Sequence, residues 1–241
     1  MKNIKQINQN NNMNNKPKFY DKRKLWMESI PFVIFIILIV GAIIYYPKIP
    51  STIPTHWNSS GQADAFGGKS SIFIIPIMFF VILILFFILP LMEVFRENMI
   101  KIYNYYYAFK IMFSLFFAVL FVATILPTLG YNINVSRVVI AMIGLLFISL
   151  GIILPKLKRN FMFGIRTGWT LSSDEVWDKT HKLGGVLFII LGILTILLLF
   201  LLPLEELFFV FLILTILVSL FLVFYSYYLY KNYKNNRSTK K

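Results

Sequence analysis

Six long apolar runs constrain this chain more than any other feature of its sequence. They cover residues 30–46, 71–91, 108–126, 138–154, 186–202 and 207–230. Each is close to or above the roughly 20 residues that a helix needs to cross a hydrocarbon layer about 30 Å thick. The backbone finds no water inside that layer, and the runs lack the alternation of barrel strands, so they are predicted to be helices. The sequence therefore predicts an all-α integral membrane protein with six transmembrane helices.

The distribution of positive charge predicts the orientation. If the N-terminus is cytoplasmic, 21 of the 24 lysines and arginines fall on the cytoplasmic side, and only Lys48, Lys69 and Arg137 lie outside. Six spans then make the C-terminus cytoplasmic as well. In a chain that is 58% hydrophobic, the net charge of +14 fits contact with membrane lipid headgroups, so no direct nucleic-acid binding is expected. The absence of cysteine excludes disulfides, thiol nucleophiles and cysteine-based metal sites.

The runs divide the chain into regions. Residues 1–25 are rich in Asn and Lys and are predicted to be a disordered cytoplasmic tail; a cleaved signal peptide is disfavoured because no small-residue cleavage site follows the first run. Residues 26–106 hold the first two spans around an extracellular loop at 47–70. Residues 107–230 form a four-span region with a cytoplasmic loop at 155–185, and residues 231–241 form a basic cytoplasmic tail.

The extracellular loop at 47–70 is predicted to be compact and turn-rich. Pro50 and Pro54 exclude a regular helix, and the glycines near residues 61 and 67 are typical of turns. His56, Asp64 and Lys69 are candidates for an outward-facing polar site. In the alternative interpretation, Trp57 and Phe66 anchor the loop in the membrane interface while the polar residues face water.

No metal site and no cofactor are expected. His56 and Asp64 supply too few ligands for a closed shell, and His181 is predicted on the opposite side of the membrane.

The longest polar patterned stretch is residues 160–185, within the cytoplasmic loop. Ser172 and Glu175 fit a capping box, which predicts a helix from Ser173. Two pairs four residues apart, Glu175 with Lys179 and Asp178 with Lys182, would support that helix. Gly184 and Gly185 follow and would allow a bend or a close helix approach.

Arg166 is the charged residue in this stretch that is hardest to interpret as simply solvated. It lies between Gly164 and Gly168 in a predicted tight turn. Its guanidinium could bind Asp174 or Asp178, carbonyls at a helix end, a lipid phosphate, or a carboxylate of a partner. In the alternative, Arg166 pairs locally while Trp169 and Trp177 mark the interface.

At these residues the sequence resembles a known family. The pattern that starts at Asn160, runs through 164–172 and 175–177, and ends at Thr180, His181 and Gly184 resembles the signature of the SdpI family of bacterial multi-pass membrane proteins. The pattern Pro54, His56, Asn58, Gly61 and Asp64 resembles a domain of unknown function that often precedes that signature.

The resemblance implies immunity: protection of a cell from a secreted toxin or antimicrobial peptide, and also the retention of a cytosolic transcriptional repressor at the membrane. The toxin-facing residues it implies outside are Pro54, His56, Trp57, Asn58, Gly61, Asp64 and Lys69. The partner-binding residues it implies inside are Asn160, Gly164, Arg166, Thr167, Trp169, Thr170, Glu175, Trp177, Thr180, His181 and Gly184.

Two other function classes fit the residues less well. A multi-pass transporter or lipid-handling protein remains the alternative, but the six apolar runs carry almost no ionisable residues, which disfavours ion coupling. An enzyme is not expected, because the sequence has no nucleophile elbow, no zinc-ligand His pair and no phosphate-binding Gly loop. No catalytic residues are therefore predicted.

Overall fold

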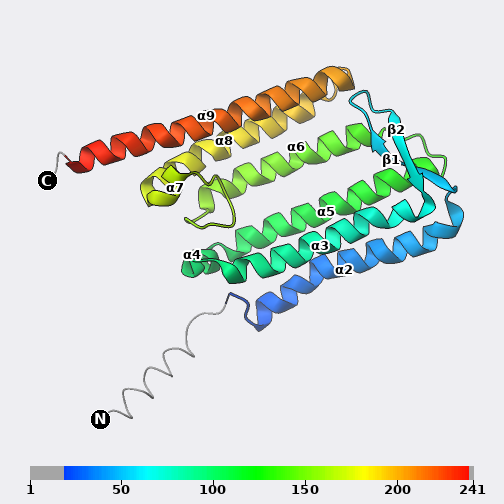
Figure 1. The fold of residues 1–241 in the computed structure, drawn as a ribbon, viewed down its shortest axis with the longest axis horizontal. Helices are drawn as coiled ribbons and strands as arrows, with labels where there is room; N and C mark the ends of the chain where they lie inside the picture. Colours follow the sequence, from blue (N-terminus) through cyan, green and yellow to red (C-terminus); the bar gives the residue numbers. More distant parts are fainter. Residues whose placement is uncertain (1–18, 239–241) are drawn as a thin grey trace, which may run out of the picture.

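The computed structural model describes residues 19–238 and shows long helices lying side by side (Figure 1). Six of them are long and apolar enough to cross a membrane: Lys22–Lys48, Lys69–Met92, Tyr103–Thr128, Val135–Lys156, Asp174–Leu198 and Leu204–Asn235. The predicted helical fold with six transmembrane helices is confirmed. The cytoplasmic placement of both termini stays a prediction.

The elements follow one another in a simple order. They are α2 (Lys22–Tyr45), η1 (Tyr46–Lys48), β1 (Thr52–Trp57), β2 (Ala63–Gly68), η2 (Lys69–Phe73), α3 (Ile74–Ile88), η3 (Leu89–Met92), α4 (Arg96–Lys101), α5 (Tyr103–Thr128), α6 (Val135–Ile153), η4 (Leu154–Lys156), α7 (Gly168–Ser172), α8 (Asp174–Leu198) and α9 (Leu204–Ser238).

Two helices extend into the segments predicted to be tails. Asp21 caps α2 by accepting a hydrogen bond from the backbone N–H of Lys24, so residues 22–25 are helical and their assignment to a disordered tail is wrong. Residues 1–18 lie outside the described residues. At the other end, α9 continues to Ser238, into the predicted tail at 231–241. Apolar runs mark where a helix crosses the lipid, whereas caps and continued backbone bonding decide where it ends.

The spanning helices form two groups. α2, α3 and α5 pack against one another, α8 packs against both α6 and α9, and α5 joins the groups by packing against α6. At one end of the bundle lies the β1–β2 hairpin, and at the other end lie α4, α7, the start of α2 and the end of α9 (Figure 1). These ends are called the hairpin end and the motif end below.

Four glycines bring α6 and α8 unusually close. Gly144 and Gly151 on α6 face Gly192 and Gly185 on α8. A Cβ added to Gly185 would lie 2.7 Å from the carbonyl oxygen of Gly151, and one added to Gly192 would lie 2.5 Å from that of Gly144. Both distances are shorter than van der Waals contact, so the two backbones touch, as small residues permit in membrane helix pairs. This packing confirms the close helix approach predicted at Gly185.

An ion pair is buried within the other group. Lys110 of α5 donates a hydrogen bond to Glu28 of α2 at 2.5 Å, and the Tyr103 hydroxyl donates to the second carboxylate oxygen at 3.1 Å. Glu28 is 3% exposed and Lys110 is 1% exposed. The expectation that the spans hold almost no ionisable residues therefore needs correction: α2 begins before its apolar run and brings Glu28 against Lys110, which lies within the run at 108–126.

The loop at 47–70 contains a β-hairpin that the all-helical prediction did not include. β1 and β2 pair antiparallel, with Thr52 opposite Gly68 and Trp57 opposite Ala63. Asn58 makes the turn: its carbonyl accepts from Gly61 N–H and its side chain accepts from Gln62 N–H, both at 2.9 Å. Gly61 adopts a φ of +81°, which favours glycine.

Breaking the buried ion pair should destabilise the protein strongly. Glu28→Gln or Lys110→Met leaves the opposite charge buried without its partner, which costs about 3–5 kcal/mol. The measurement is denaturant unfolding of the purified protein in detergent. The double variant Glu28→Gln/Lys110→Met should be less destabilised than the two single losses added together. Glu175→Gln, which breaks an exposed pair with Lys179, is the control and should change little. A small effect of both single buried variants would contradict a structural role for the pair.

Candidate functional site

The hairpin end carries the first candidate site, built on β1 and β2. His56 Nδ1 donates to Asp64 Oδ1 at 2.5 Å across the hairpin, and both side chains are largely exposed. The predicted juxtaposition of an imidazole and a carboxylate on the outer loop is thus present as a close pair. Within residues 19–238 no group of three or more His, Cys, Asp or Glu side chains could hold a metal ion.

Other predicted residues of this loop hold the hairpin in place. Gly61 lies at its tip, where a Cβ would come within 2.7 Å of Leu204 at the start of α9. The neighbouring Ser60 donates to Glu205 at 3.1 Å. Lys69 lies at the base, with its ammonium 5.1 Å from the Tyr46 ring centroid and 3.5 Å from the Pro47 carbonyl oxygen. The hairpin is therefore fastened at both ends to the helices.

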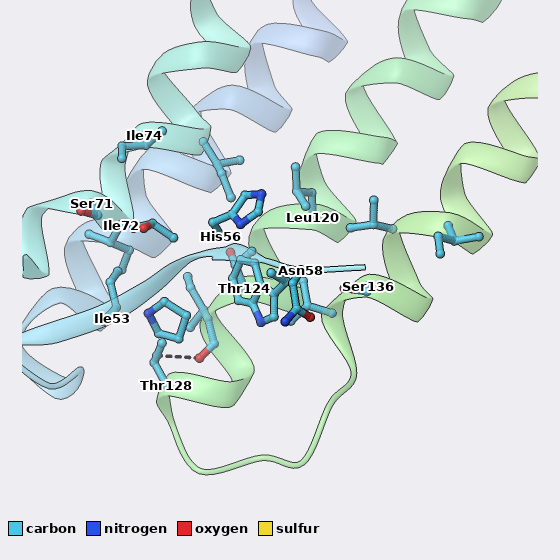
Figure 2. Close-up of a pocket in the computed structure, with 18 of the residues that line it drawn as sticks. Ile53, His56, Asn58, Ser71, Ile72, Ile74, Leu120, Thr124, Thr128 and Ser136 are labelled. Carbon is cyan, nitrogen blue, oxygen red and sulfur yellow. Dashed lines mark hydrogen bonds between the residues drawn. The ribbon is translucent and has the colours of Figure 1, made fainter. Parts of the chain in front are cut away.

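A cavity of about 540 Å³ lies beneath β1 (Figure 2). Residues 54–59 line one side, so the predicted toxin-facing residues Pro54, His56, Trp57 and Asn58 share this wall. The opposite walls come from α3, α5, α6 and α9, with mostly apolar side chains that include Met78, Leu120, Val139, Ile143, Phe208 and Phe211. Sequence reasoning missed the cavity, because its walls come from elements far apart along the chain.

The motif end carries the second candidate site, the loop between η4 and α7. Asn160 is fully buried and organises it: its amide nitrogen donates to the carbonyls of Lys158 and Phe163, and its amide oxygen accepts from the N–H groups of Met162 and Phe163. Every hydrogen-bonding direction of this side chain is used within the loop. Asn160 thus shapes the loop from inside.

Trp177 and His181 form a buried, stacked pair of rings on α8, against which this loop packs. Trp177 is 0% exposed and its indole N–H donates to the Leu157 carbonyl at 3.0 Å. The His181 ring stacks on it with 3.9 Å between centroids. His181 Nδ1 donates to the Trp177 carbonyl at 2.8 Å, and Nε2 accepts from Ile165 N–H at 2.9 Å, so both nitrogens are engaged by a neutral ring. The interpretation of Trp177 as an interfacial anchor is wrong.

Gly164 and Gly184 allow the loop to pack closely against α8 and the Trp177–His181 pair. Gly164 has a φ of +120°, and a Cβ there would come within 2.5 Å of His181 Nε2. A Cβ on Gly184 would come equally close to Ile165 Cδ1. Gly168, in contrast, faces open space.

Helix capping differs from the prediction. Ser172 ends α7 and its hydroxyl donates to the Trp169 carbonyl, so it does not cap α8. The cap is Ser173, one residue later, and α8 begins at Asp174. A capping box does exist, between Thr167 and Thr170 at the start of α7. The sequence has two consecutive serines, and only the turn that follows α7 decides which of them caps the next helix.

The charges around the loop pair differently from two of the predicted arrangements. Arg159, not Arg166, binds Asp174, with 2.9 Å between Nε and Oδ1. Arg166 is exposed and donates to the Phe161 carbonyl, which lies in the loop itself and not at a helix end as one of the predicted alternatives had it. Glu175 pairs with Lys179 at 2.7 Å as predicted, whereas the five ion pairs found among the described residues do not include Asp178 with Lys182.

Two residues that sequence reasoning missed join the α4 region to the motif loop. The buried Glu93, just before α4, accepts from the N–H groups of Phe95 and Phe161. Asn98 of α4 donates to the Arg159 carbonyl at 2.8 Å. No local pattern marks these two residues, because their partners in the motif loop lie more than sixty positions away along the chain.

The predicted inner-site residues thus separate into two groups. Buried ones support the loop: Asn160, Thr170, Trp177, Thr180, His181 and Gly184. Arg166 and Glu175 are exposed, and Thr167 and Trp169 are partly exposed. Trp169 lies 5.1 Å from the Tyr227 ring and Thr167 Oγ1 lies 3.1 Å from Ser226 Oγ, so α9 supports this surface.

Comparison with known proteins supports the predicted resemblance. Residues 156–226 match the SdpI/YfhL protein family, and residues 32–80 match a domain of unknown function, DUF1648. The Immunity protein SdpI of Bacillus subtilis (strain 168) is 24% identical over 163 residues, which cover 68% of this chain and 76% of that protein. No solved structure matches significantly. The predicted resemblance to the SdpI family is confirmed, and the chain is a multi-pass protein of the cell membrane.

Substitution at Gly164 should disturb the motif loop far more than substitution at Gly168. In Gly164→Ala the new Cβ would displace His181 and occupy a φ that L-residues avoid, with a cost of at least about 1–3 kcal/mol. Gly168→Ala adds the same atom in open space and should be neutral or slightly stabilising. Unfolding of both variants in detergent measures the difference. Equal stability of the two would show that Gly164 does not pack against His181 in this way.

Proposed function

We propose that this membrane protein protects the cell that carries it from a secreted toxin. The similarity to the Immunity protein SdpI, which covers about two thirds of the chain, is the observation that carries this proposal. The match to the family model includes the whole motif loop and α8, and the match to DUF1648 includes the hairpin. Both candidate sites therefore lie in the matched parts of the chain.

The geometry supports a protein that binds rather than one that transforms its ligand. The His56–Asp64 pair, the walls of the cavity and the ordered hairpin provide a recognition surface at one end of the molecule. At the motif end, the buried polar groups already hydrogen-bond within the protein, except for two atoms: the hydroxyl of Thr180, and Nε of Arg159, which forms an ion pair with Asp174 at 2.9 Å. Binding alone is sufficient for immunity.

A second role belongs to the same proposal: the motif end holds a cytosolic transcriptional repressor at the membrane. Arg166, Trp169 and Glu175 present charged and aromatic groups on a loop that is braced from inside by Trp177 and His181. A braced surface loses little conformational freedom on binding, which favours recognition. The positive-inside charge pattern supports a cytoplasmic position for this end.

Expression of the chain in a toxin-sensitive host should raise the toxin dose needed to kill. The test challenges the host with culture supernatant of the source strain. Asp64→Ala removes the partner of His56 and should lower the toxin dose needed to kill the host about tenfold relative to the native chain, which corresponds to about 1.4 kcal/mol of binding. Glu206→Ala, which removes an exposed carboxylate from the same end, should protect like the native chain.

Two outcomes would contradict this proposal. Lack of protection by the native chain would overturn immunity, and equal losses in Asp64→Ala and Glu206→Ala would overturn the role of the hairpin pair. Sidedness is the control: the native chain has no cysteine, so Gln62→Cys and Ser172→Cys each carry a single thiol. An impermeant maleimide should label Gln62→Cys on intact cells and Ser172→Cys only after lysis.

Arg166→Ala should reduce recruitment of the repressor without affecting membrane insertion. Arg166 is exposed, so its removal takes away a charged contact while Asn160 and His181 still shape the loop. The measurement is the membrane-bound fraction of a fluorescent fusion of a repressor encoded beside the toxin gene. Lys158→Ala, another exposed cation of the same loop, is the matched control. Unchanged recruitment by Arg166→Ala would remove this surface from the proposal. Trp177→Ala is a poor test, because this side chain is buried.

A further inference from the structure

The cavity beneath β1 is large enough to hold part of a ligand. Its volume of about 540 Å³ falls within the range of small-ligand sites and corresponds to roughly 18 water molecules. Two of the hydroxyls on its helix side are already engaged by their own helix: Thr124 donates to the Phe121 carbonyl at 2.9 Å, and Thr128 donates to the Ile125 carbonyl at 2.6 Å. Water would therefore find few partners on the helix side, and an apolar group would replace it favourably there.

The walls that face β1 suit apolar side chains. Val139 and Ile143 come from α6, Leu120 from α5, Met78 from α3 and Phe208 from α9. Met78 and Phe208 are about half exposed, so the cavity is open rather than sealed. An open apolar cavity that combines a flexible methionine with aromatic rings accepts side chains of varied shape.

The remaining wall comes from β1. Residues 54–59, which are most of β1 and the start of its turn, run along the cavity (Figure 2). In the described part of the chain the sheet has two strands, so β1 has β2 on one side and no strand on the other. A free strand edge offers backbone N–H and C=O groups to an extended peptide. A lipid chain can use the apolar walls but has no backbone to pair with this edge.

We propose that the cavity binds apolar side chains of an extended peptide segment that lies along the free edge of β1. This inference rests on the proposed function and names the part of a secreted toxin that the protein recognises. It also explains why predicted toxin-facing residues such as His56 and Asn58 line the same cavity as Leu120 and Val139. The apolar walls supply affinity and the strand edge supplies orientation.

The first test fills the cavity. Val139→Trp should lower the toxin dose needed to kill the host at least about tenfold, because the new ring would fill the space that the peptide side chains occupy in this proposal. Leu145→Trp places the same ring on an exposed position of α6 outside the cavity and should protect normally. A second pair guards against misfolding: Phe208→Ala removes part of a cavity wall and should lose protection. Phe209→Ala, at a somewhat more exposed neighbouring position outside the cavity, should not.

The second test observes the cavity directly. Val139→Cys is a single thiol in the cavity, and Leu145→Cys is its control. In detergent, the toxin preparation against which the native chain protects should slow maleimide labelling of Val139→Cys severalfold and leave Leu145→Cys unchanged. If phospholipid vesicles alone block Val139→Cys and the toxin adds nothing, the occupant is a lipid chain and the proposal is overturned.

The outcomes separate this inference from the function on which it rests. If the native chain protects and Val139→Trp and Phe208→Ala protect equally well, the cavity is not the peptide site while immunity stands. If the native chain protects against no secreted preparation, both fall. Loss of protection by the two cavity variants alone, together with toxin-dependent shielding of Val139→Cys, supports both.

Discussion

Backbone contact between α6 and α8 is the constraint on which the motif end depends. Gly144 and Gly151 meet Gly192 and Gly185 so closely that no larger residue fits. The connection from α6 to α8 contains η4, the motif loop and α7. The contact between the two helices therefore sets the distance that this connection spans. Small residues provide such contact in lipid, where apolar surface alone gives helices little reason to associate.

The polar side chains of residues 160–184 are largely turned inward. Asn160, Thr170 and His181 form hydrogen bonds with the backbone of the loop, and the Trp177 indole donates to the Leu157 carbonyl at its start. A polar group buried near a membrane has to be satisfied within the protein, which explains why so many hydrogen-bonding side chains gather here. The surface left for a partner is smaller than the motif and centres on Arg166, Trp169 and Glu175.

The hairpin end is built on a different principle. There the polar residues are exposed and the interior is a cavity, formed where the two helix groups lie beneath β1. Gly61 fits against Leu204 and Ser60 reaches Glu205, so the hairpin is held above the cavity by contacts at its tip. The hairpin with its cavity and the braced motif loop thus occupy opposite ends of one bundle (Figure 1).

The sequence by itself determined the six spans, because about twenty consecutive apolar residues have no other stable arrangement than a helix in lipid. It also showed where polar residues concentrate and that Gly185 would permit close packing. Only the tertiary structure decided that Arg159 rather than Arg166 binds Asp174, that Ser173 caps α8, that Glu28 meets Lys110, and that residues 52–68 pair as strands above a cavity. Hydrophobicity acts residue by residue and can be read locally, whereas ion pairs, caps, strand register and cavities depend on which distant backbones are brought together.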